Sequence, residues 1–280
     1  MIGAGISQRP GADVATEARD VERLGFDFLT ITDHLVGGRG SLETWTQLTW
    51  AAAATERIRI GTNVLGLPYR PPAVLAKMAE TLDRLSGGRL ILGLGGGASN
   101  EAFRAFGLAV RSPGEKVDAL EEAVEIIRRL WTEPGVSVRG EHFRVEDASI
   151  EPRPERQIPI WLGVYGRRAL GVAARLADGW IPSMPFASPE RFVTLRDRLL
   201  TAAEEAGRDP GEIILAYNVG VQIQEGRVAD ERSVAGGVAE VTDRLGDLIQ
   251  RLGLGALSLW IRGEEQRQRF AEEILPALRR

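Results

Sequence analysis

Short apolar runs alternate with longer amphipathic segments along the whole chain. Eight of these runs fit β-strands, and several are almost continuously apolar, as strands covered on both faces tend to be. The predicted strands span residues 2–6, 28–32, 58–63, 90–95, 158–163, 179–182, 213–221 and 256–261.

The segments between these runs predict helices. One helix begins after Ser112, which with Pro113 and Glu115 supplies an N-cap, an N1 proline and a capping-box acid. Its apolar positions recur at steps of three and four residues, at Val117, Leu120, Val124, Ile127 and Trp131. Another helix stops at Gly87 and Gly88, and its predicted apolar stripe contains Val74, Leu75, Met78, Leu82 and Leu85.

Eight strand–helix units in 280 residues predict an α/β fold, a single (β/α)8 TIM barrel over residues 1–280. A doubly wound parallel sheet is the alternative. Residues 133–157 interrupt the alternation with turn signals and prolines. We interpret them as an insertion between the fourth helix and the fifth strand, for which a hairpin is one possible form.

Composition excludes several functional classes. The net charge of −4 argues against a nucleic-acid surface, and no apolar stretch approaches the length of a membrane span. The N-terminal residues lack the features of a secretory signal, so we expect a cytoplasmic protein. The absence of cysteine excludes thiolate chemistry, and two histidines, His34 and His142, argue against a histidine-rich metal site. We therefore expect a small-molecule substrate and no metal.

Candidate catalytic residues follow from the barrel, because barrel enzymes place their active sites at the carboxyl ends of the strands. His34 follows the second predicted strand and can exchange a proton near neutral pH. A histidine in a turn can also be structural, but its position favours a catalytic role. The adjacent Asp33 either orients His34 or caps the following loop.

Three other strand ends carry glycines. The segment from Gly61 to Gly66 permits close backbone approach, although a plain strand-to-loop transition explains it more simply. The loop Gly95–Gly97 leaves room for a flat ring or a phosphate, and flexible turn chemistry explains it equally well. The fifth strand enters a helix at residues 163–167, where free N–H groups and Arg167 attract phosphate. Its Gly-x-x-Gly spacing is not the dinucleotide fingerprint.

In their order and spacing, several segments resemble the luciferase-like monooxygenase superfamily. The resemblance covers most of the chain through residue 182, and its closest match is the branch that uses coenzyme F420, a 5-deazaflavin. The matching segments are Gly25-Phe26-Asp27, Asp33-His34, residues 55–64, Arg70-Pro71-Pro72, residues 85–95, residues 159–163 and residues 177–180.

The resemblance implies a cofactor that lies across the barrel mouth. It also implies a non-proline cis peptide bond between Asn63 and Val64, forming a bulge behind the deazaflavin ring, and proton transfer by His34. Asp33 is the second catalytic candidate. The predicted cofactor-binding residues are Asp33, Asn63, Val64, Gly66, Gly95, Gly96, Gly97, Gly163, Val164, Tyr165, Gly166, Arg167 and Ser183.

The chain departs from the branch that oxidises glucose 6-phosphate. Ala98 stands where that branch has an acidic residue, and residues 183–186 lack its lysine, which argues against a sugar-phosphate substrate. Met184, Pro185 and Phe186 suggest a less polar pocket. Trp260 and Arg262, at the end of the eighth strand, either line the pocket or simply pack.

The sequence therefore predicts an F420-dependent oxidoreductase that transfers a hydride to or from an unidentified small organic substrate. One alternative keeps the fold but uses reduced FMN and molecular oxygen in monooxygenation. The other is a barrel that binds a flavin without catalysis. We also expect a homodimer, with Trp45 and Trp50 as candidate contacts.

Overall fold

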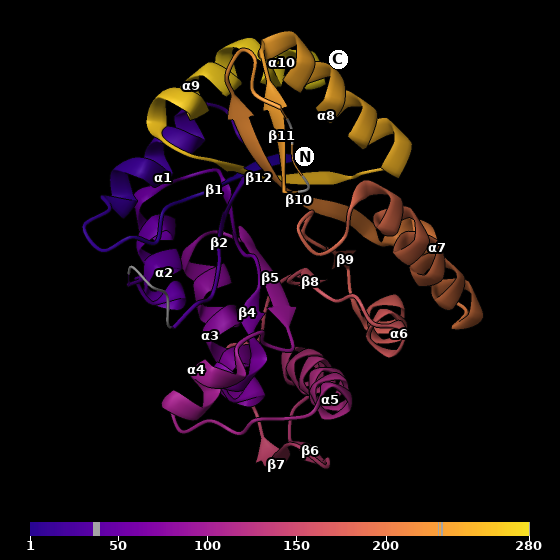
Figure 1. Ribbon diagram of the computed structural model, residues 1–280. Helices are drawn as coiled ribbons and strands as arrows, with labels where there is room; N and C mark the ends of the chain where they lie inside the picture. The colour runs from indigo at the N-terminus through magenta and orange to yellow at the C-terminus, as the bar shows by residue number, and fades with distance from the viewer. Residues whose placement is uncertain (36–39, 229, 231, 280) are drawn as a thin grey trace.

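Eight parallel strands pair side by side and close into a barrel (Figure 1). The computed structural model describes residues 1–35, 40–228, 230 and 232–279. Pairing of Ile2 with Leu257 and of Ile214 with Gly179 completes the ring. In their order around the barrel, the strands are β1 (Ile2–Gly5), β2 (Phe28–Ile31), β3 (Arg59–Thr62), β5 (Leu90–Gly95), β8 (Ile160–Leu162), β9 (Gly179–Trp180), β10 (Ile214–Ile223) and β12 (Ala256–Ile261).

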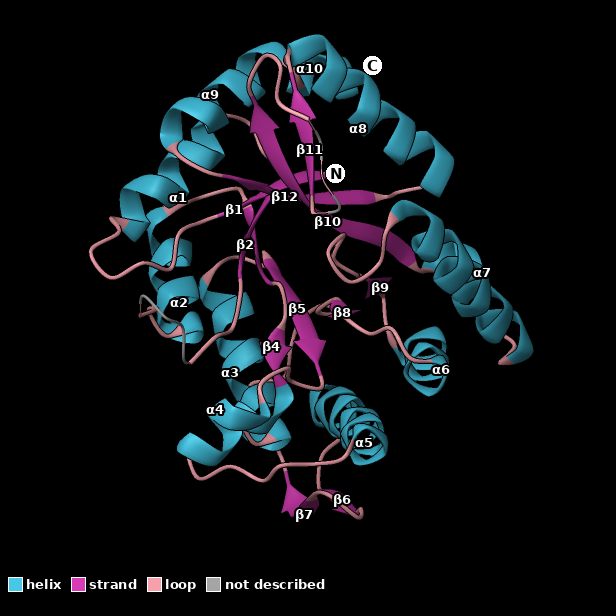
Figure 2. Cartoon of the chain, in the orientation of Figure 1, coloured by secondary structure: helices cyan, strands magenta, loops and turns pink. Residues whose placement is uncertain are grey.

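Helices surround the strands on the outside of the barrel (Figure 2). They are α1 (Val14–Arg23), α2 (Thr44–Ala54), η1 (Leu67–Tyr69), α3 (Pro72–Leu85), α4 (Asn100–Ala105), α5 (Pro113–Thr132), α6 (Arg167–Leu176), α7 (Pro189–Glu205), η2 (Pro210–Glu212), α8 (Val238–Leu252), α9 (Glu264–Glu273) and α10 (Leu275–Leu278). Two further strands extend the sheet, β4 (Leu65–Gly66) beside β5 and β11 (Ser233–Gly236) beside β10.

All eight predicted strands form, and their ends differ from the prediction by no more than two residues. The predicted TIM barrel is confirmed, and the doubly wound sheet is wrong because the parallel strands form a closed ring. Between α5 and β8 the chain forms an antiparallel hairpin of β6 (Val136–Arg139) and β7 (Arg144–Ala148). The hairpin projects from the body at the edge of the molecule (Figure 1).

The predicted capping of α5 is confirmed, whereas the predicted apolar stripe of α3 is only partly correct. Ser112 Oγ accepts from the backbone N–H of Glu115 at 3.3 Å, and the Glu115 carboxylate accepts from the N–H of Ser112 at 2.7 Å. In α3 the predicted stripe is wrong at two positions, because the side chains of Val74 and Leu85 are exposed. The buried face of α3 uses small residues in their place, and its apolar members are Pro72, Leu75, Ala76, Ala79 and Leu82.

The barrel interior is packed at the amino-terminal ends of its strands. Side chains alternate between the two faces of a strand, so every second residue points inward. A cluster separate from the helix–sheet core fills the inside, and it consists of Phe28, Ile91, Trp161, Ile181, Ala216 and Ala256. A Cβ at Gly3 would overlap the Phe28 ring, so glycine at this position leaves space for the aromatic side chain.

The outer surface of the described residues carries no helix long and apolar enough to cross a membrane. Within the same residues, no three histidine, aspartate or glutamate side chains gather as a metal site would require. On α2, Trp45 is partly buried, whereas 65% of Trp50 is exposed. The two tryptophans therefore differ, and only Trp50 presents a large apolar surface to solvent.

Gly246, inside α8, provides a test of how the helices pack. A methyl group added at Gly246 would have no atom within 4 Å. Glycine inside a helix costs about 0.5–1 kcal/mol relative to alanine, so Gly246→Ala should raise the free energy of unfolding by that amount, measured with urea. Gly253, with φ of 66° at the end of α8, is the matched control, and its alanine variant should be less stable than the wild type. A destabilised Gly246→Ala protein would show that the space beside Gly246 in α8 is not open.

Candidate active site

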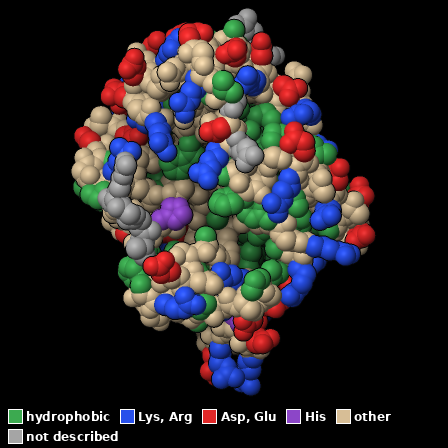
Figure 3. Space-filling view, viewed as in Figure 1, with side chains coloured by type: hydrophobic (Ala, Val, Ile, Leu, Met, Phe, Trp, Pro, Cys, Tyr) green, Lys and Arg blue, Asp and Glu red, His purple; other side chains and the backbone are tan. Residues whose placement is uncertain are grey.

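A cavity of about 750 Å³ opens at the carboxyl ends of the barrel strands, a volume typical of small-molecule sites. The space-filling view shows the hollow on this face of the molecule (Figure 3). Trp260 and Arg262 line the cavity rather than packing elsewhere. The cavity is also lined by most of the site residues predicted from the sequence, namely Asp33, His34, Asn63, Val64, Gly66, Gly95, Gly96, Gly97, Gly163, Tyr165 and Ser183.

Three predicted cofactor-binding residues, Val164, Gly166 and Arg167, do not line this cavity. Val164 is buried, and its carbonyl accepts a hydrogen bond of 2.8 Å from the Trp180 indole. Gly166 is the N-cap of α6 without a side-chain cap, and Arg167 is exposed in the first turn. These residues form the turn between β8 and α6, and their part in cofactor binding stays a prediction.

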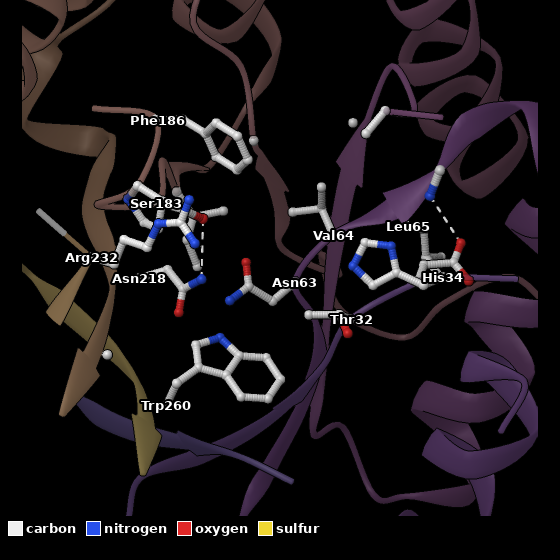
Figure 4. Close-up of a pocket in the computed structure, with 18 of the residues that line it drawn as sticks. Thr32, His34, Asn63, Val64, Leu65, Ser183, Phe186, Asn218, Arg232 and Trp260 are labelled. Carbon is white, nitrogen blue, oxygen red and sulfur yellow. Dashed lines mark hydrogen bonds between the residues drawn. The ribbon is translucent and has the colours of Figure 1, made fainter. Parts of the chain in front are cut away.

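Val64 occupies a space that glycines provide. The peptide bond between Asn63 and Val64 is cis, as the resemblance implied. A Cβ at Gly95 would lie 2.8 Å from Val64 Cγ2, and one at Gly163 would lie 3.1 Å from both Val64 methyl groups. Gly95 and Gly163 therefore accommodate the Val64 side chain, in addition to keeping the cavity open. Val64 lies between the two walls of the cavity (Figure 4).

Hydrogen bonds between buried side chains hold the Asn63 amide in place. Its amide Nδ2 donates to Ser258 Oγ at 3.2 Å, and Ser258 Oγ lies 3.1 Å from Thr30 Oγ1. All three side chains are at most 8% exposed. One N–H of the amide is bonded to Ser258, and the amide oxygen, which has no partner among the described residues, is available to accept a hydrogen bond in the cavity (Figure 4).

Asp33 connects the end of β2 to the segment that carries Val64. Its Oδ2 accepts from the N–H of Gly66 at 2.9 Å and from Arg70 Nη1 at 3.0 Å, and its side chain is fully buried. Within the described residues its Oδ1 has no hydrogen-bond partner, and Asp33 makes no hydrogen bond to His34. The geometry therefore favours an anchoring role for Asp33 over direct catalysis.

His34 is exposed and lines one wall of the cavity, where its imidazole lies beside Val64 (Figure 4). Its carbonyl accepts a hydrogen bond from the Ser41 hydroxyl, which holds the backbone at this point. An accessible imidazole can exchange a proton with a bound molecule or with solvent. The position predicted from the strand end is therefore suitable for proton transfer.

The opposite wall carries a neutral hydrogen-bonded group (Figure 4). The N–H of Ser183 donates to the Tyr165 hydroxyl at 3.0 Å, and Asn218 Nδ2 donates to Ser183 Oγ at 3.1 Å. Burial raises the pKa of Tyr165, only partly offset by its hydrogen bonds to Ser183, so the phenol stays protonated at neutral pH. Asn218 was missed because it lies within a strand, in the third of the chain where the sequence is least diagnostic, although strand alternation points it inward.

The rim is more polar than residues 183–186 suggested. Phe186 and Pro185 do line the cavity, but Met184 is buried in the core. Asp230 and Arg232, which were not predicted from the sequence, precede β11 and lie exposed at the rim with Arg262. The four-residue strand β11 gave no recognisable apolar run, so this side of the cavity was not predicted.

Comparison with known proteins identifies the family. The model of the family described as luciferase-like monooxygenase matches residues 2–263. The chain belongs to this family. Among its relatives, an F420-dependent glucose-6-phosphate dehydrogenase from Kineococcus radiotolerans is 35% identical over 222 residues, which are 76% of this chain and 64% of that enzyme. The chain thus matches somewhat less than two thirds of that relative's length.

Two solved structures have the same fold. An F420-dependent secondary alcohol dehydrogenase, in complex with an F420–acetone adduct, superposes with a TM-score of 0.89 at 20% identity over 100% of this chain and 99% of that one. The monooxygenase RslO1 from Streptomyces bottropensis gives a TM-score of 0.84 at 23% identity, covering 98% of both chains. At these identities the likeness shows the barrel fold alone.

The glycine beside Val64 gives a testable prediction for the site. Gly95→Ala would push a methyl group against Val64 Cγ2, so we expect it to lower the free energy of unfolding by about 1–3 kcal/mol. Gly96→Ala is the matched control, because a Cβ there would lie 3.4 Å from Lys116 Cβ, an ordinary contact. Chemical denaturation of both variants measures the difference. Equal stabilities would show that Val64 does not need the space at Gly95.

Proposed function

We propose that this protein is an F420-dependent oxidoreductase that transfers a hydride between the deazaflavin and a small organic substrate. The observation that carries the proposal is that most of the site residues predicted from the resemblance line one cavity of about 750 Å³. Membership of the luciferase-like family and the 35% identity to an F420-dependent dehydrogenase support it. The departures at Ala98 and at residues 183–186 argue against glucose 6-phosphate as the substrate.

The residues present fit such a cofactor. Val64 would support the flat ring from below, Asn63 would offer its amide oxygen, and the loop of residues 95–97 would lie along an edge. Ser183 and Tyr165 would hold the polar chain of the cofactor, with the turn to Arg167 near its phosphate. When bound, F420 supplies a ring carbon that donates or accepts a hydride.

The chain itself supplies the proton and the shielding. His34 would hold or accept a proton at its imidazole, since it is the accessible acid–base group beside Val64. Asp33 would keep Gly66 and the adjoining bulge in place through its buried oxygen. Trp260 and Phe186 would exclude water from two sides of the reacting region.

Two other functions fit the same fold. The likeness to the monooxygenase from Streptomyces bottropensis keeps open an enzyme that uses reduced FMN and oxygen. A barrel that binds a flavin without turnover would retain the cavity but not the need for His34. Oxygen consumption that depends on reduced FMN would favour the first, and cofactor binding without turnover of any substrate in a broad panel would favour the second.

The choice of cofactor can be tested directly by binding. Purified protein should bind F420 more tightly than FMN, because the predicted cofactor-binding positions resemble those of the deazaflavin branch. Fluorescence titration of both cofactors gives the two dissociation constants. A lower dissociation constant for FMN would refute the F420 assignment and favour the monooxygenase.

The role of His34 is testable against the other histidine of the chain. A general acid contributes about 10²–10⁴-fold in rate, so His34→Ala should reduce turnover by that factor with a modest effect on F420 affinity. His34→Gln keeps a hydrogen-bond donor but cannot shuttle a proton, and it should be nearly as slow. His142→Gln, in the turn between β6 and β7, is the control and should retain wild-type turnover. Full activity of His34→Gln would reduce His34 to a positioning donor.

We also propose that the protein acts in the cytoplasm as a homodimer in which α2 contributes to the interface. The 65% exposure of the Trp50 side chain supports this, and closed two-fold pairs are the commonest homo-oligomers. Light scattering at micromolar concentration should give the mass of two chains, and Trp50→Glu should shift it toward one. A wild-type mass of one chain would contradict the proposal.

A further inference from the structure

Arg70, which does not line the cavity, joins two carboxylates from different elements. Its Nη1 donates to Asp33 Oδ2 at 3.0 Å, and its Nη2 is hydrogen-bonded to the Glu43 carboxylate. Asp33 directly precedes His34 at the end of β2, and Glu43 is the N-cap of α2. The guanidinium therefore bridges the two ends of the connection between β2 and α2.

The three charges lie in surroundings that make this bridge specific. The Asp33 side chain is fully buried, that of Arg70 is 11% exposed and that of Glu43 is 42% exposed. Burial opposes ionisation of Glu43, but the N–H groups of Thr46 and Trp45 and the charge of Arg70 outweigh it and lower its pKa. The planar guanidinium meets the two carboxylates from two different nitrogens, a geometry that the single nitrogen of a lysine ammonium cannot reproduce.

Other bonds hold the backbone beside His34 to the start of α2. The carbonyl of Thr32 accepts from Thr44 Oγ1 at 2.6 Å and from Gln8 Nε2 at 2.6 Å. The same Asp33 oxygen that meets Arg70 also accepts from the N–H of Gly66. One carboxylate oxygen thus connects Arg70, the strand end that carries His34 and the segment that carries Val64.

We propose that Arg70 is a positioning residue for His34, because its bridge between Asp33 and Glu43 fixes the backbone from which the imidazole enters the cavity. Through the bond from Asp33 to Gly66, the same bridge sets the position of His34 relative to Val64. The inference rests on the proposed function only in giving His34 its task of proton transfer.

The two histidines of the chain allow a test that does not depend on the cofactor. In a ¹H–¹³C spectrum of the protein without cofactor, the imidazoles of His34 and His142 give separate signals, assigned with His142→Gln. In Arg70→Met we expect the His34 signal to move toward the position of an unstructured histidine, while the His142 signal stays in place. We also expect the F420 dissociation constant to rise about tenfold, because the segment that carries Val64 loses a support.

A matched control and a conservative variant sharpen the test. Arg269→Met removes an arginine from an exposed pair with Glu273 on α9 and should leave both histidine signals and F420 affinity unchanged. Arg70→Lys keeps the charge but has one nitrogen in place of the two that meet the carboxylates, so its His34 signal should lie between those of the wild type and Arg70→Met. An Arg70→Met protein that is folded and shows an unchanged His34 signal would overturn the proposal.

If Arg70→Met does not fold, the milder variants Arg70→Lys and Glu43→Gln test the positioning role instead. In both, a displaced His34 signal with an unchanged His142 signal supports the bridge, and an undisturbed His34 signal refutes it. If the wild type fails to bind F420 while the His34 signal responds as expected, the positioning role stands and the proposed cofactor is wrong.

Discussion

The cavity exists because the inward positions of the barrel strands change in size from one end to the other. In β8 the large Trp161 points inward and is followed two residues later by Gly163, and in β5 Ile91 is followed by Gly93 and Gly95. Strand number and backbone hydrogen bonds set the width of a closed barrel, so the space left inside it at each level depends on the size of the inward side chains. Large residues close the amino-terminal half, and glycines leave the other half open.

The open half is then occupied from one side by Val64. Its side chain fits where Gly95 and Gly163 lack a Cβ, and the part of the cavity that Val64 lines is called the floor here. Asp33 holds this floor to the end of β2 through the N–H of Gly66. The floor and the histidine wall are therefore joined by one buried carboxylate, and the opposite wall is held separately by the bond between Asn218 and Ser183.

Local patterns in the sequence identified what depends on local chemistry. Apolar runs located all eight barrel strands, and the strand-end rule located His34. The partners of Asp33 were not predictable in this way, since Arg70 lies 37 residues away and meets it only in the folded barrel. Asn218 illustrates an intermediate case: alternation along β10 would have pointed it inward, but nothing in one strand shows that Ser183 stands opposite.

The titratable groups around the cavity also restrict which residue can exchange a proton at neutral pH. Burial raises the pKa of Tyr69, aided by the negative charge of Asp33, and burial raises the pKa of Tyr165, so both phenols remain protonated. Asp33 is buried and paired with Arg70. Asp230 is exposed, and its hydrogen bonds to the N–H of Arg232 and to the Ser233 hydroxyl lower its pKa, so it holds no proton at neutral pH. An accessible imidazole next to Val64 is what remains among the described lining residues. The state of its neighbours, together with its position at a strand end, therefore supports the proposed proton-transfer role of His34.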